Sequence, residues 1–225
     1  MCKYIYLASN LAMSTPVLLL IVFNILVSYK GFSESRFFER YKFSVLALQK
    51  QQYFRLLSSG FLHVDSAHLI FNMFALYMFG DVVIQITGVF LFMLIYILSL
   101  LAGNYFTYVN HKNEPSYSAV GASGAVSGIV YSSILLFPQM QLALIFFPIP
   151  MPGYVFGILY LLYTLFGMKS RRDNIGHTAH FGGAVSGFAI TLFIFPSLIY
   201  MQTNLILLML IPLIVYLVMK RNSNL

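Results

Sequence analysis

The sequence predicts an all-α polytopic membrane protein. Of its 225 residues, 60% are hydrophobic and 8% are charged, and the mean hydropathy is +0.83. Soluble domains carry roughly 25% charged residues and about 45–50% apolar ones. Long stretches without a formal charge alternate with short charged segments. These observations argue against a soluble cytosolic enzyme, a disordered chain and a nucleic-acid-binding module, so we expect lipid and no nucleic acid around the chain.

The charged and proline-rich segments divide the chain, taken as a single transmembrane domain over residues 1–225, into seven expected spans. A membrane-crossing helix needs about 20 apolar residues. The first span lies in the charge-free stretch 4–29, and the others are expected at 67–87, 89–108, 119–137, 153–167, 177–195 and 203–219. The last one, within residues 196–225, adds a C-terminal transmembrane helix to a bundle of six.

Two connections between the spans are long. The first loop, residues 30–66, holds eight charged residues before position 56, and its apolar residues follow an amphipathic pattern. That pattern predicts helices lying at the membrane interface. The prolines of residues 139–152 predict a buried or re-entrant connection between the fourth and fifth spans.

Three polar clusters lie at membrane depth, where polar side chains are costly and mark functional sites by default. They contain His63, His68 and Asn72, then Ser123, then His177 and His180. Each cluster begins an even-numbered span, and the even-numbered spans all run in one direction. We therefore expect the three clusters near the same face of the membrane.

Small residues predict which of these spans touch. Gly124 and Gly128 on the fourth span, and Gly183 and Gly187 on the sixth, have the spacing that lets helix backbones approach closely in lipid. His180 shares one helical stripe with Gly183 and Gly187. Contact between the two spans therefore brings His180 towards Ser123.

These residue types indicate acyl-transfer chemistry. A serine hydroxyl becomes a nucleophile when a neighbouring base takes its proton, and histidine suits that role because it titrates near neutrality. His68 and Asn72, four residues apart, share one helix face and can both donate hydrogen bonds to developing negative charge. The backbone N–H of Ser123 is a third donor. Neither the fourth nor the sixth span contains a carboxylate, so a Ser–His dyad is expected, without metal or cofactor.

The motifs together resemble the signature of the rhomboid intramembrane serine proteases. The resemblance runs over residues 54–187 and rests on Gly121-x-Ser123-Gly124, on the series His63…His68…Asn72, and on Ala179-His180-x-Gly182-Gly183. It implies a rhomboid-like six-helix bundle and an endopeptidase that cleaves transmembrane segments of membrane proteins. It also implies Ser123 as nucleophile, His180 as general base, and an oxyanion hole of His68, Asn72 and Ser123.

The resemblance further implies a structural role for His63, a cap at residues 169–174 and a lateral gate at the fifth span. Phe54-Arg55 matches the family's aromatic–Arg pair. The family often has an aromatic residue four positions after the serine, where it stacks on the histidine, but this chain has Ser127. The acidic residue common near the end of the second span has no clear match. His177 is an alternative base, and we favour His180 because it lies on the glycine stripe.

The orientation in the membrane is predicted in two opposing ways. Most lysine and arginine residues lie on the side of the first loop, and the positive-inside rule places that side in the cytoplasm. The resemblance places the site on the extracytoplasmic side of a cell (inner) membrane. We follow the resemblance, because a long ordered loop is a poor place to apply the rule.

Two alternative functions stay open at this point. A catalytically inactive rhomboid-like protein would keep the fold and bind client helices. A metal transporter or metalloprotease would use the histidines as ligands, because imidazole binds zinc well. The HExxH pattern is missing from the sequence, which disfavours the metalloprotease.

Overall fold

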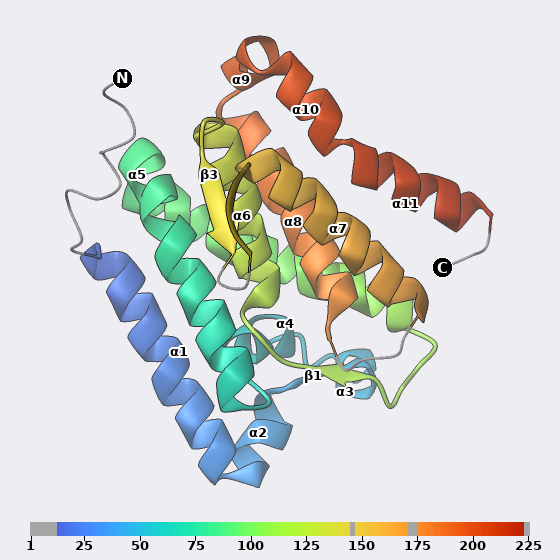
Figure 1. Ribbon diagram of the computed structural model, residues 1–225. Coiled ribbons are helices and arrows are strands. Elements are labelled where there is room, and N and C mark those ends of the chain that lie inside the picture. The colour runs from blue at the N-terminus through green and yellow to red at the C-terminus, as the bar shows by residue number, and fades with distance from the viewer. Residues whose placement is uncertain (1–12, 145–146, 171–174, 223–225) are drawn as a thin grey trace.

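A computed structural model describes residues 13–144, 147–170 and 175–222 (Figure 1). Helix α1 (Thr15–Ser33), helix α5 (Ser66–His111) and the run Thr203–Arg221 are long and apolar enough to cross a membrane. Helix α6 (Ser123–Leu136) is a shorter apolar helix. Together with the surrounding helices they confirm the predicted all-α polytopic membrane protein.

Helix α5 contains two of the predicted spans. Gly88 has a φ of 80° and a ψ of 167° and breaks the helix, so that the chain rises and then turns back (Figure 1). The break falls between the predicted spans 67–87 and 89–108. At the other end, the Asp65 side chain accepts the His68 N–H at 2.7 Å and caps the helix. This cap sets the position at which His68 enters the first turn.

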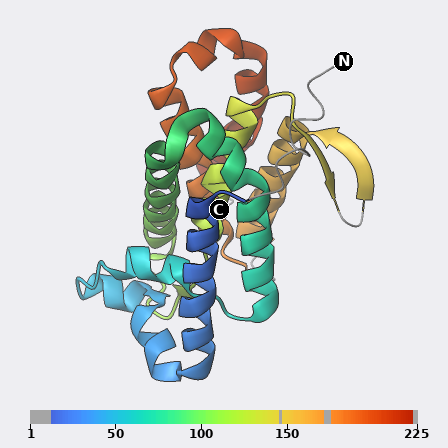
Figure 2. The ribbon, with the colours of Figure 1, turned by 90° about the vertical axis from the view of Figure 1, so that its left-hand side faces the viewer.

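Helices α6, α7 (Gly153–Ser170) and α8 (His177–Ile194) follow α5 and correspond to the predicted spans 119–137, 153–167 and 177–195. Strands β3 (Gln141–Leu144) and β4 (Phe147–Pro152) pair as an antiparallel hairpin between α6 and α7. Of the buried or re-entrant connection predicted here, the burial is wrong, because Gln141, Ala143 and Ile149 are exposed. Figure 2 shows the hairpin projecting sideways from the bundle.

The first loop forms a compact layer at one end of the bundle. It consists of α2 (Ser35–Tyr41), β1 (Phe43–Ser44), α3 (Val45–Gln49), α4 (Arg55–Ser58) and the 3₁₀ turn η1 (Ser59–Phe61). Strand β1 pairs antiparallel with β2 (Ser118–Ala119), which leads into α6. The buried Arg55 donates to the backbone oxygens of Glu39 and Lys42 at 2.9 and 2.8 Å. These bonds tie the loop's elements together.

Glycines bring α6 and α8 into backbone contact. A Cβ added to Gly183 would collide with the carbonyl group of Gly124, and one added to Gly187 with that of Gly128. On α5, a Cβ at Gly103 would lie 2.6 Å from the Ala179 oxygen. Helix α6 is therefore enclosed by protein, with 12 of its 14 residues buried.

The C-terminal segment consists of α9 (Ser197–Met201), α10 (Thr203–Met209) and α11 (Ile211–Arg221). Pro212 is the second residue of α11, and Leu210 separates α11 from α10. Tyr216 of α11 packs on Phe181, with ring centroids 4.8 Å apart, and on Phe106 at 5.7 Å. Figure 1 shows α10 and α11 running beside α7, which they contact.

Candidate active site

The N-termini of three helices converge at the end of the bundle that carries the first loop (Figure 1). His68 lies in the first turn of α5, Ser123 is the first residue of α6, and His180 lies in the first turn of α8. The first N–H groups of a helix have no partner within it, and the helix dipole places partial positive charge there. This end of the bundle therefore favours negative charge.

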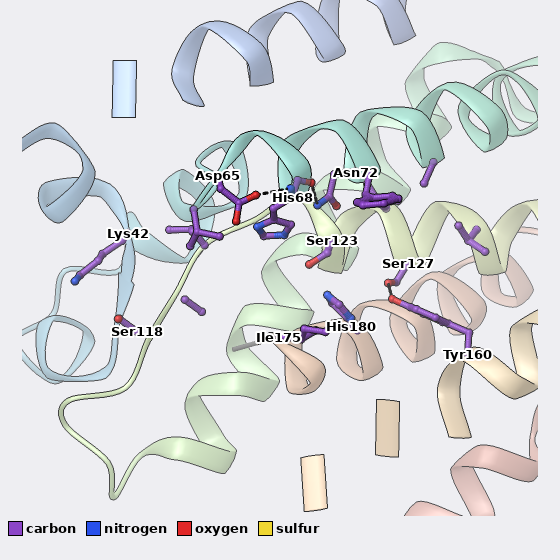
Figure 3. Close-up of a pocket in the computed structure, with 18 of the residues that line it drawn as sticks. Lys42, Asp65, His68, Asn72, Ser118, Ser123, Ser127, Tyr160, Ile175 and His180 are labelled. Carbon is purple, nitrogen blue, oxygen red and sulfur yellow. Dashed lines mark hydrogen bonds between the residues drawn. The ribbon is translucent and has the colours of Figure 1, made fainter. Parts of the chain in front are cut away.

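A cavity of about 1150 Å³ opens at this point, and Figure 3 shows side chains that line it. Polar lining residues include Lys42, Asp65, Ser116 and Ser118, and apolar ones include Phe71 and Phe79 of α5 and Phe156 of α7. His68, Asn72, Ser123 and His180 all line the same cavity. The Ser123 and His180 side chains, from α6 and α8, both face this cavity (Figure 3).

Gly121 shapes the turn that presents Ser123. Its φ of +135° lies in the region that favours glycine, and its N–H donates to the Ser59 oxygen at 3.0 Å. A Cβ there would lie 2.7 Å from Cε1 of His68, 2.9 Å from Nε2 of His68 and 3.5 Å from Oγ of Ser123. The His68 ring and the Ser123 hydroxyl therefore both lie close to the backbone of Gly121, where there is no room for a side chain.

Asn72 lies one turn after His68 and is 6% exposed. Its Nδ2 donates to the His68 oxygen at 3.0 Å, which holds the amide against its own helix. An amide nitrogen carries two hydrogens, so one is left to donate into the cavity.

His63 connects α1 to the turn before Ser123. Its Nδ1 lies 2.8 Å from Ser28 Oγ on α1, and its Nε2 accepts the Ala122 N–H at 3.4 Å. An accepting Nε2 leaves the proton of the neutral ring on Nδ1. Burial, aided by His68 and opposed by Asp65, lowers the pKa of His63 to about 3.

Acidification should therefore destabilise the protein through His63. Between the unfolded pKa near 6.5 and the folded pKa of about 3, the unfolded chain binds the proton and the folded one does not. Stability is fully present above pH 6.5 and falls by up to roughly 1.4 kcal/mol per pH unit below it. Denaturation in mild detergent from pH 7 to pH 4 measures this slope.

The control for this experiment is His63→Gln, whose amide can accept from Ala122 and donate to Ser28 without titrating. The variant should show a shallower loss of stability with acid than the wild type. Equal slopes for the two proteins would contradict a neutral, buried His63.

The two histidines of α8 have different surroundings. The His180 ring stacks on Tyr160 of α7, with centroids 6.0 Å apart and planes 22° apart. His177 is buried against Gly167 and meets the edge of Tyr163 at 5.4 Å. His180 lines the cavity, and His177 is not among its lining residues.

Two contacts were not anticipated from the sequence. Tyr160 takes up the space beside His180, and its hydroxyl lies 2.8 Å from Ser127 Oγ. Asp81 of α5 accepts the Ser14 N–H at 3.2 Å and the Ser14 hydroxyl, at the start of α1. For the contact of Asp81 with Ser14, the available signal was an acidic residue inside a predicted apolar span. For the contact of Tyr160 with His180 there was no such signal, because tyrosine is common in an apolar helix.

The cap and the alternative metal site predicted from the sequence both concern this region. Of the predicted cap at 169–174, residues 171–174 lie outside the described residues. Within the described ranges, no three His, Cys, Asp or Glu side chains gather as a metal site requires.

Fold and site together define a helical membrane protein with a polar cavity at converging helix ends. The model of the Rhomboid domain matches residues 50–197, well over half of the chain. The chain therefore belongs to the rhomboid family, as its motifs predict, and is a multi-pass membrane protein.

Similar proteins come from plants, fungi and bacteria. The chain is 29% identical over 175 residues to RHOMBOID-like protein 12, mitochondrial, of Arabidopsis thaliana, covering 71% of this chain and 52% of that protein. It is 30% identical to Rhomboid protein 1, mitochondrial, of Saccharomyces cerevisiae, over 59% of this chain and 39% of that one. The Putative rhomboid protease YdcA of Bacillus subtilis is 30% identical over 148 residues, 65% of this chain and 69% of that protein. The match thus spans about half the length of the plant relative and less of the yeast one.

Proposed function

We propose that the chain is an intramembrane serine endopeptidase that cleaves transmembrane segments of other membrane proteins. The observation that carries the proposal is the cavity that holds Ser123 from α6 and His180 from α8, with His68 and Asn72 of α5 on its wall. Membership of the rhomboid family supports it. So does the bacterial relative, whose name describes a putative rhomboid protease.

The proposed reaction uses Ser123 as nucleophile and His180 as general base. Ser123 Oγ attacks the carbonyl carbon of the scissile peptide bond while His180 takes the hydroxyl proton. The tetrahedral intermediate collapses, the C–N bond breaks, and His180 returns the proton to the leaving amine. Water, deprotonated by His180, then attacks the acyl-enzyme ester, and the serine hydroxyl is restored.

Three donors in this proposal face the oxyanion of the intermediate. They are the His68 ring, the free amide hydrogen of Asn72 and the backbone N–H of Ser123. The converging helix N-termini add partial positive charge at the same place. Such preset donors stabilise the transition state most when the site excludes bulk water.

Asn72→Ala tests the oxyanion role. It should lower the cleavage rate by roughly 10²- to 10³-fold, about 3 kcal/mol of transition-state stabilisation, which is the usual loss for one such donor. Asn110→Ala is a matched control, because Asn110 of α5 makes the same bond to the oxygen four residues earlier and does not line the cavity. The control should cleave at the wild-type rate, and an equal loss in both variants would argue against the role.

The length of α6 supports a site that lies below the membrane surface. Its 14 residues span about 21 Å, whereas the hydrocarbon core of a bilayer is about 30 Å thick. Irregular backbone at membrane depth is tolerated where it lines a water-filled cavity. The segment from Ser116 to Gly121, much of which lines the cavity, meets this condition.

Substrate entry is proposed between α5 and α7, with α7 as the lateral gate. Phe71 and Phe79 of α5 and Phe156 of α7 line this part of the cavity. An apolar wall accepts a helix coming from lipid. The helix must unwind to react, because an intact helix keeps its carbonyl groups hydrogen-bonded.

The deciding experiment uses the purified chain in liposomes. The wild type should react with a fluorophosphonate probe, which labels an activated serine, and should cleave a co-reconstituted transmembrane substrate with or without a chelator. Absence of both labelling and cleavage would leave the inactive, helix-binding alternative. Chelator-sensitive cleavage would favour the metal alternative.

The membrane and the orientation are also proposals. The relatives include proteins named mitochondrial and one from a bacterium. We propose a cell (inner) membrane with the site opening to the extracytoplasmic side. In a Cys2→Ser background, a cysteine at Lys112, whose backbone oxygen contacts Gln49 of the first loop, should react with an impermeant maleimide on intact cells, and one at Gln139, just beyond the far end of α6, should not. The reverse pattern would overturn the orientation.

A further inference from the structure

Tyr160 joins three helices at the candidate base. Its ring stacks on His180 of α8, and its hydroxyl lies 2.8 Å from Ser127 Oγ of α6. Ser127 is 3% exposed and lies one turn after Ser123. Figure 3 shows Ser127 and Tyr160 meeting beside His180. One side chain of α7 thus contacts the helices that carry both the serine and the histidine.

The Tyr160 ring makes the aromatic contact with His180 that Ser127 cannot make. A serine at this place is too small to lie flat against an imidazole, and the Tyr160 ring occupies the space from the opposite helix. Offset stacking at a centroid distance of 6.0 Å is a favourable geometry for aromatic rings. The hydrogen bond to Ser127 fixes the ring of Tyr160, and the ring then limits the rotation of His180.

We propose that Tyr160 is the positioning residue of His180, held in place by Ser127. The inference rests on the proposed function, because it assigns a partner to the proposed base. It also makes alignment of the base depend on α7, the helix proposed as gate. Phe156, one turn earlier on α7, stacks on Tyr160 at 6.0 Å and lines the cavity.

The test compares Tyr160→Leu, Tyr160→Phe and a matched control, Tyr163→Leu, on the same helix. Tyr163 meets His177 and does not line the cavity. Tyr160→Leu should lower kcat by roughly ten- to hundred-fold, as misplacement of a reacting group does, with KM unchanged. Tyr160→Phe keeps the ring but loses the hydrogen bond to Ser127, so its rate should lie between those of the wild type and Tyr160→Leu, and Tyr163→Leu should match the wild type.

The small fluorophosphonate probe separates positioning from substrate contact. A misaligned base slows labelling of Ser123 even when no substrate helix is present, so Tyr160→Leu should lower the labelling rate in parallel with kcat. Unchanged labelling with a raised KM would overturn the proposal in favour of a substrate contact. A wild-type rate in Tyr160→Leu, or an equal loss in Tyr160→Phe or Tyr163→Leu, would overturn it too. An inactive wild type would instead refute the proposed function.

Discussion

Replacing Ser123 or His180 by alanine is expected to abolish cleavage of a transmembrane substrate. Each change should lower the rate by roughly 10³-fold or more, because nucleophile and base act as one unit and neither works alone. Ser123→Ala should also remove all labelling by the fluorophosphonate probe, whereas His180→Ala should leave slow residual labelling. The measurement is initial cleavage rate in liposomes at equal protein density.

Two controls match these variants. Ser186→Ala removes a hydroxyl of α8 that bonds to the Gly182 oxygen at 2.8 Å and does not line the cavity. His177→Gln replaces the other histidine of the α8 first turn. Both should keep most of the activity. Full activity in Ser123→Ala would end the protease proposal. Full activity in His180→Ala together with loss in His177→Gln would move the base to His177, and full activity in both histidine variants would end the proposal too.

Gly183→Ala is expected to destabilise the whole bundle. The added methyl group meets the backbone carbonyl of Gly124, which cannot move aside as a side chain can. The cost should be about 3 kcal/mol, the upper end for overpacking in a core. Separation of α6 from α8 should also draw His180 away from Ser123, so activity should fall with stability. Thermal unfolding in detergent measures the first effect and probe labelling the second.

Gly153→Ala is the matched control for this change. Gly153 is also buried, but a Cβ there would make ordinary contacts at 3.5 Å with Ile134 and Met140. The control should unfold near the wild-type temperature. A Gly183→Ala protein as stable as Gly153→Ala would show that α6 and α8 are less tightly joined than the glycine contacts indicate.

The spans could be predicted because each depends on local composition. Gly88 breaks α5 between the predicted second and third spans, and α8 begins at the predicted His177. The shared direction of alternate spans then placed the three polar clusters at one end. These inferences need only the length of apolar segments and the rule that successive spans alternate in direction.

Features that depend on distant pairing were not predictable in the same way. Helix α6 begins four residues after the predicted residue 119, because Ala119 pairs with Phe43 in β2 and β1. The 139–152 segment forms a hairpin, because prolines are compatible with edge strands as well as with a re-entrant turn. Tyr160 reaches His180 only through the packing of α7 on α8, which no local pattern encodes.

The shortness of α6 has a consequence for how the protein responds to lipid. A short helix facing the bilayer would force the surrounding lipids to thin or the helix to rise. Neighbouring helices bury residues 124–135 of α6, and so acyl chains are kept away from most of its length. In the proposed arrangement the fold itself therefore sets the immersion depth of the serine, and bilayers of different thickness should act mainly on the outer helices.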